Sequence, residues 1–112
     1  MKGRAIGFLR LDISQTRQPE DQRSIEDVAA GLGYRLTRTL VIEPGAINGT
    51  LRLLEAAHSD RVFAVIVPSI MHVEATQRGI SEQFDLVTAD DRNFLERGHH
   101  WPWRNLRPLA AF

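Results

Sequence analysis

Short apolar runs that alternate with amphipathic segments are the feature that most constrains this fold. The runs at 5–11 and 61–67 are apolar almost throughout, which is typical of strands buried on both faces. Between them, apolar residues over 25–32 repeat at the spacing of a core-facing helix, expected to begin near Pro19 and to end at Gly33. Because strands that alternate with helices form right-handed crossovers, this order predicts a three-layer α/β fold. Its sheet is expected to be mainly parallel, with about four strands and a flavodoxin-like topology.

Turn signals and apolar spacing set the other expected elements. In chain order, they are a polar loop over 12–18, a strand over 34–42, a turn over 43–45, a helix over 46–58, an imperfect helix over 70–83, a strand over 84–88, and a short helix that Thr88 opens and Gly98 closes. Two sets of apolar residues are expected to face the core. In the strand over 34–42 they are Leu36, Leu40 and Ile42, and in the helix over 46–58 they are Ile47, Leu51 and Leu54.

Length and charge restrict the classes of function. A chain of 112 residues suits one domain, which we place at 1–98, followed by an aromatic and basic tail at 99–112. The 14 Lys and Arg residues balance the 14 Asp and Glu residues. A dedicated nucleic-acid module usually carries a basic excess, since counterion release supplies much of its affinity. Any DNA contact is therefore expected to be weak and to come from a local patch.

The chain contains no cysteine. This excludes disulfides, thiol catalysis and zinc sites with cysteine ligands. His72, His99 and His100 lack carboxylates at ligand spacing, so we expect solvated loops there, with no metal and no cofactor. The apolar stretch 5–9 is too short for a signal segment or a membrane span, which predicts a cytoplasmic protein without membrane contact.

Polar residues follow each of the first three expected strands. In parallel α/β sheets, ligands bind at the carboxyl ends of the strands. The candidate crevice residues at that edge are Arg10, Asp12, Ser14, Arg17, Glu43, Ser69 and His72.

The N-terminal motifs resemble a known family. Ile6-Gly7-Phe8-Leu9-Arg10-Leu11-Asp12 precedes Gln22 and a helix ending in Ala29-Ala30-Gly31. This is similar to the N-terminal catalytic domain of the serine recombinases, the resolvase and invertase family, which opens with strand–aromatic–x–Arg–x–Ser. The likeness continues through Glu43 and Asn48-Gly49 and includes the strand expected at 62–67. It covers roughly the first four-fifths of the chain. It implies a resolvase-like α/β fold and association as a dimer.

Departures from the family pattern remove its chemistry. The resemblance implies that the serine two places after the arginine attacks the DNA phosphodiester. Arg10 matches that arginine, but Asp12 occupies the position of the serine. The family continues with Leu-Asp-Arg-Leu and another Arg, where this chain has Ile-Met-His-Val-Glu-Ala at 70–75. Met71 and His72 cannot replace guanidinium forks around a phosphate. No helix-turn-helix pattern follows Gly98.

Three hypotheses of function remain open. The first is a non-catalytic, pseudoenzyme-like domain that acts through self-association, as a homodimer, or through a related protein. The second is a DNA-associated accessory protein that modulates site-specific DNA recombination. The third is a hydrolase or nuclease with a site rebuilt from Arg10, Asp12 and Ser14. In the plainest alternative, Arg10 pairs with Asp12 or Glu43 and Ser14 caps a turn.

The tail carries the most unusual local pattern. Trp101, Trp103 and Arg104 lie close together among polar residues. Such aromatic residues either fold back onto their own domain or form a contact for a partner, and the sequence leaves both open.

Overall fold

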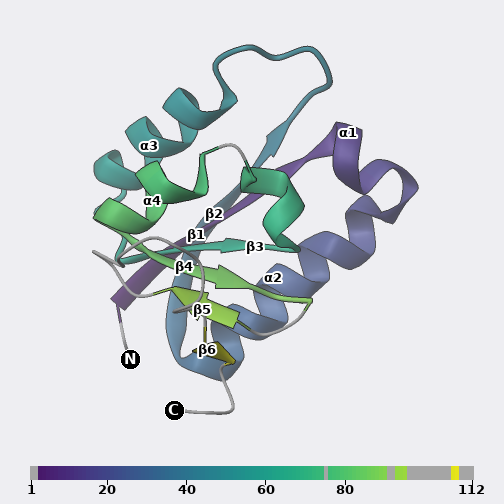
Figure 1. Ribbon diagram of the computed structural model, residues 1–112. Helices are drawn as coiled ribbons and strands as arrows, with labels where there is room; N and C mark the ends of the chain where they lie inside the picture. The colour runs from purple at the N-terminus through teal and green to yellow at the C-terminus, as the bar shows by residue number, and fades with distance from the viewer. Residues whose placement is uncertain (1–2, 75, 91–92, 96–106, 109–112) are drawn as a thin grey trace.

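Parallel strands joined by helices make up the molecule (Figure 1). The computed structural model describes residues 3–74, 76–90, 93–95 and 107–108. In chain order the elements are β1 (Gly3–Arg10), α1 (Leu11–Ser14), the 3-10 helix η1 (Gln15–Arg17), α2 (Gln18–Leu32), β2 (Tyr34–Ile42), α3 (Gly49–Ser59), β3 (Ala64–Val67), the 3-10 helix η2 (Ile70–Val73), α4 (Gln77–Gln83), β4 (Asp85–Thr88), β5 (Asn93–Leu95) and β6 (Arg107–Pro108).

The strands form one sheet in the order β2-β1-β3-β4-β5-β6. The first four strands in this order are parallel, and β5 and β6 add a short antiparallel edge. The order β2-β1-β3-β4 is that of flavodoxin-like folds. The predicted α/β class and its mainly parallel sheet are therefore confirmed.

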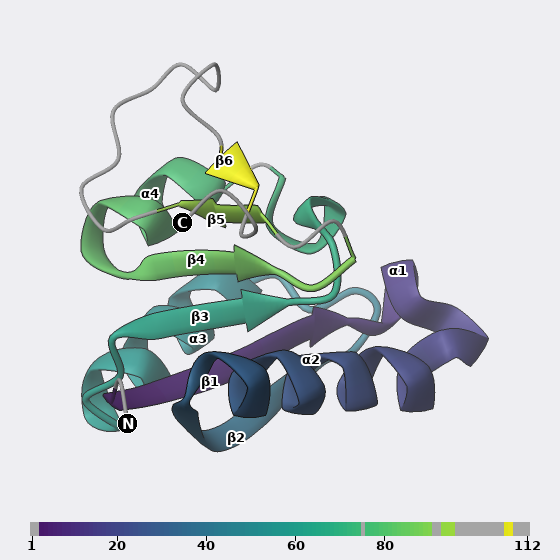
Figure 2. The same ribbon diagram turned by 90° about the horizontal axis from the view of Figure 1, so that it is seen from below.

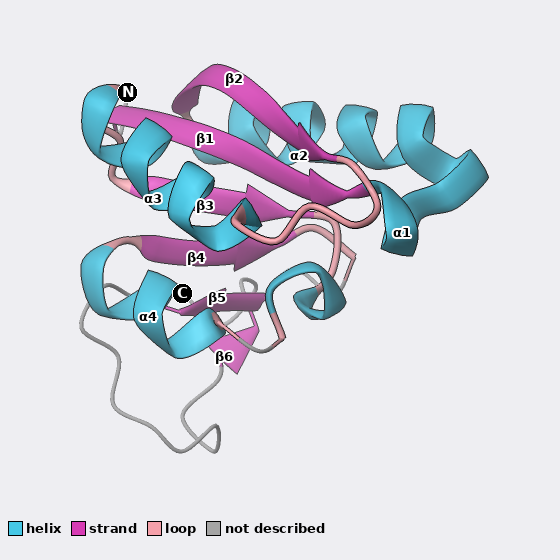
Figure 3. Cartoon of the chain, turned by 90° about the horizontal axis from the view of Figure 1, so that it is seen from above, coloured by secondary structure: helices cyan, strands magenta, loops and turns pink. Residues whose placement is uncertain are grey.

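Helices cover both faces of the sheet, which makes three layers (Figures 2 and 3). On one face, Ile25, Val28 and Ala29 of α2 pack against the sheet. On the other face, Leu53 of α3 and Ile80 of α4 join a second buried cluster. Because successive side chains in a strand point to opposite faces, a strand covered on both sides is apolar throughout. This explains the unbroken apolar run of β3, whose four residues are all buried.

The helix α2 begins and ends as the sequence predicts. Pro19 lies in its first turn, where a missing N–H leaves no intrahelical bond unmade. Gly33 ends the helix in the left-handed conformation, with φ of 81°, and its N–H donates to the carbonyl groups of Ala29 and Ala30.

A register shift corrects the predicted alternation of β2. Ala5 pairs with Leu36, but Gly7 pairs with Thr39, so β2 contains an extra residue between these pairs. The bulge turns Leu36 towards the α2 layer, whereas Leu40 and Ile42 pack in the opposite cluster. The three residues were predicted to share one face, which is wrong because a bulge reverses the pleat.

Three further predictions about local structure are wrong. The segment 12–18, predicted as a loop, contains α1, η1 and the start of α2. The predicted helix 46–58 begins only at Gly49, so Ile47 lies in the preceding loop and is 94% exposed instead of facing the core. Leu51 is also exposed, and the buried face of α3 is formed by Leu53, Ala56 and Ala57.

The segment after β4 differs from its expected helix as well. Residues Asn93–Leu95 form β5, which pairs antiparallel with β4. An adjacent strand edge offers these backbone groups a ladder of hydrogen bonds, which a capping-box pattern does not reveal. Two residues of the tail, Arg107 and Pro108, form β6 beside β5.

Candidate functional site

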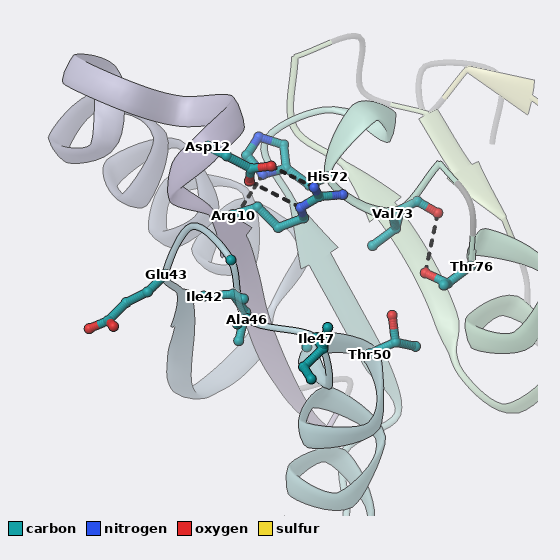
Figure 4. Close-up of a pocket in the computed structure, with 12 residues that line it drawn as sticks. Arg10, Asp12, Ile42, Glu43, Ala46, Ile47, Thr50, His72, Val73 and Thr76 are labelled. Carbon is teal, nitrogen blue, oxygen red and sulfur yellow. Dashed lines mark hydrogen bonds and ion pairs between the residues drawn. The ribbon is translucent and has the colours of Figure 1, made fainter.

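A pocket of about 210 Å³ opens at the carboxyl ends of β1, β2 and β3 (Figure 4). The end of β1 contributes Arg10, the end of β2 leads into Glu43, and η2 after β3 contributes His72. The remaining lining residues are Asp12, Ile42, Gly45, Ala46, Ile47, Gly49, Thr50, Val73 and Thr76. The pocket lies where parallel α/β sheets bind their ligands.

The guanidinium of Arg10 is paired within the protein. Its Nε donates to Oδ1 of Asp12 at 3.1 Å, and its Nη2 donates to Oδ2 at 2.6 Å. The bidentate hydrogen bonds from Arg10 lower the pKa of the Asp12 carboxyl from its usual value of 3.8. Asp12 thus occupies the fork with which Arg10 would otherwise bind an anion.

His72 connects β1 to η2. Its side chain is buried, at 2% exposure, and its Nδ1 accepts a hydrogen bond from the backbone N–H of Arg10 at 2.9 Å. This geometry requires an unprotonated Nδ1. Burial lowers the pKa of His72 from 6.5, and the nearby Asp21 opposes that effect. The expectation of a solvated loop is wrong for His72, and the neighbouring Met71 is the exposed residue.

Ser14 belongs to a different polar contact, whose residues do not line the pocket. The hydroxyl of Ser14 donates to Oδ2 of Asp21 at 2.6 Å, and both residues are buried. Arg17 also approaches Asp21, at 3.9 Å, but its side chain is 78% exposed. A buried hydroxyl that donates to a carboxylate is not presented to a substrate.

The structure therefore divides the predicted crevice residues into two groups. Arg10, Asp12, Glu43 and His72 line the pocket together. Ser14, Arg17 and Ser69 follow the expected strands but do not line it. The sequence analysis did not single out Asp21 as a partner of Ser14. Ser14 lies seven residues before Asp21, but many pairs of polar surface residues share that spacing, so the spacing alone does not predict the contact.

Polar groups from the loops complete the pocket wall. Thr50 lies in the first turn of α3, and Thr76 precedes α4. The hydroxyl of Thr76 donates to the carbonyl group of Val73 at 3.4 Å (Figure 4). No signal in the sequence pointed to either threonine, because each comes from an element whose position depends on the tertiary fold.

Metal ligands do not gather in the described part of the chain. No group of three His, Cys, Asp or Glu side chains that could hold a metal ion occurs among the described residues. His99, His100 and the predicted partner-contact residues Trp101, Trp103 and Arg104 lie outside the described residues. None of the helices within the described ranges is long and apolar enough to cross a membrane.

Comparison with protein-family models, with curated proteins and with solved structures finds no match to this chain.

Proposed function

We propose that this chain is a non-catalytic, resolvase-like domain that acts by associating with a second copy of itself. The observation that carries the proposal is the internal pairing of every side chain that a rebuilt catalytic site would use. Arg10 is held by Asp12, Ser14 is buried on Asp21, and the Nδ1 of His72 is occupied by a backbone N–H. A nucleophile needs a free approach as well as an adjacent base. Asp21 lies beside the Ser14 hydroxyl, but both residues are buried, so this arrangement offers a substrate no free approach.

Exposed apolar side chains beside the same pocket support association. Ile47 is 94% exposed at the pocket wall, and Met71 is more than half exposed next to His72. Leu51 is exposed in the first turns of α3. Single exposed hydrophobic residues are common, but several that lie in or next in sequence to the lining of one pocket favour a contact site. The resemblance to a family that works as dimers favours a second copy as the partner.

Sedimentation over a range of protein concentrations tests the association. We expect a reversible shift from monomer to dimer that Ile47→Asp weakens, because the change places a charge in an apolar contact. Ala30→Asp, which adds the same charge at an exposed position near the end of α2, is the matched control and should leave the dimer intact. A monomer at every concentration, or equal loss of the dimer in both variants, would refute the proposed association.

A plasmid assay separates this proposal from the rebuilt hydrolase. Supercoiled plasmid is incubated with the protein and analysed by denaturing electrophoresis. We expect neither nicked DNA nor a covalent protein–DNA adduct. A nicked product that disappears in Ser14→Ala would replace the proposal with a nucleophilic role for Ser14.

A further inference from the structure

A second hollow, of about 500 Å³, lies at the opposite edge of the sheet from the pocket. Its walls come from the start of β1, the start of β2 and the end of α3. Figure 2 shows the start of β1 at the far end of the strand from α1. This position is unrelated to the edge where flavodoxin-like folds bind their ligands, and the proposed self-association does not use it.

Two arginines lie opposite each other on neighbouring strands at this hollow. Arg4 of β1 and Arg35 of β2 are register partners, and both are exposed. Side chains of partner residues point to the same face, and like charges directly opposite each other destabilise a sheet. The Nη1 of Arg4 donates to the backbone carbonyl of Asp60, which is a neutral acceptor, at 3.1 Å. Arg35 forms no salt bridge with any residue that the structure describes.

The carboxylate in the hollow is already used by a third arginine. Arg38 donates to both oxygens of Asp60, at 2.9 and 3.0 Å, and the hydroxyl of Thr37 donates to Oδ2 at 2.9 Å. The hydrogen bonds from Arg38 lower the pKa of Asp60 from 3.8. Three arginines thus line a hollow that contains one carboxylate. Arg38 forms the ion pair with Asp60, and the charge of Arg4 lowers the pKa of the same carboxyl further, so the hollow keeps an excess of positive charge.

We propose that this hollow binds a phosphate group, with Arg4 and Arg35 as its principal ligands. A phosphate placed between the two guanidinium groups would relieve their repulsion and accept hydrogen bonds from both planar forks, which match its oxygens. The hydroxyl of Ser59, which also lines the hollow, is available as a further donor. The phosphate belongs either to a small phosphorylated molecule or to the backbone of a nucleic acid.

Two probes distinguish these sources. Inorganic pyrophosphate is titrated by calorimetry, and a fluorescent DNA duplex of about 20 base pairs is titrated by anisotropy at several salt concentrations. Pyrophosphate binding that also displaces DNA supports the site as a receptor for small phosphorylated molecules. DNA binding that pyrophosphate does not match supports a backbone contact. If neither pyrophosphate nor DNA binds at low salt, the proposal is overturned.

The variants identify the residues responsible. Arg35→Ala should weaken binding of the active probe by about tenfold, and Arg35→Lys should restore only part of it because the fork is lost. Arg23→Ala in α2 removes one exposed positive charge away from the hollow and should change binding by less than about twofold. Equal weakening by Arg35→Ala and Arg23→Ala would show nonspecific charge attraction and overturn the site. Unchanged melting temperatures confirm that each variant is folded.

Discussion

Replacing Ser14 with alanine tests whether its buried polar contact with Asp21 stabilises the fold. The wild-type hydroxyl donates to Asp21 at 2.6 Å in a buried environment. Ser14→Ala removes the donor and leaves a buried carboxylate oxygen without it. A hydrogen bond to a charged group contributes about 1.5–3 kcal/mol, and an unsatisfied buried partner adds to the loss. Arg17 cannot compensate, because its exposed guanidinium is 3.9 Å from Asp21 and is screened by water.

Urea unfolding measures this loss directly. A decrease of about 2 kcal/mol in the free energy of unfolding corresponds to a midpoint lower by roughly 1 M urea, since small proteins unfold with slopes of about 1–3 kcal/mol per molar. Ser24→Ala is the matched control, because Ser24 lies in α2 and is only partly buried. Its side chain forms no hydrogen bond with any residue that the structure describes. That variant should change stability by less than about 0.5 kcal/mol.

A double-mutant cycle with Asp21→Ala, which removes both acceptor oxygens, completes the test. If the two side chains act as one contact, the double variant loses less stability than the two single losses added together. Equal midpoints for Ser14→Ala, Ser24→Ala and the wild type would refute the structural role of Ser14. If the losses of the two single variants simply add in the double variant, Ser14 stabilises the fold through a contact other than the one with Asp21.

Gly7→Ala should lower the free energy of unfolding by about 1–3 kcal/mol in urea titrations, because the new Cβ would lie 2.6 Å from Oγ1 of Thr39 and 2.7 Å from Cγ2 of Ile25; an unchanged midpoint would contradict the tight packing of β1. Burial lowers the pKa of His72, so the unfolded chain binds this proton more readily, and the melting temperature should fall as the pH decreases below about 6.5. His72→Gln keeps a hydrogen-bond acceptor and should reduce the change in melting temperature between pH 8 and pH 5.5. Identical pH profiles of the variant and the wild type would argue against His72 as the titrating group. Asp12→Ser should leave supercoiled plasmid uncut, because phosphoryl transfer needs several positioned cations and a single guanidinium lines the pocket in the described part of the chain; robust cleavage would show that other groups supply that charge.

The candidate site was only partly predictable from the sequence. Arg10, Glu43 and His72 were placed at one edge because parallel strands end there, and they line one pocket. Asp12 was one of the two carboxylates that the sequence analysis considered as partners of Arg10, and Glu43 was the other. The burial of His72 was not foreseen, because its partner lies 62 residues away in the chain. The hollow lined by Arg4 and Arg35 was not predicted either, because the two arginines lie side by side only through the register of β1 and β2.

The amino-acid sequence by itself determined the order of the four parallel strands and of the helices α2 and α3 in this protein. Hydrophobic periodicity and turn residues act over a few neighbouring positions, so β2, the boundaries of α2 and the burial of β3 on both faces could be inferred locally. Only the tertiary structure decided the bulge in β2, the antiparallel β5 and the contact between Ser14 and Asp21. The physical reason is that each of these depends on backbone groups or side chains brought together by packing, and their free energies are set by burial and not by local propensity.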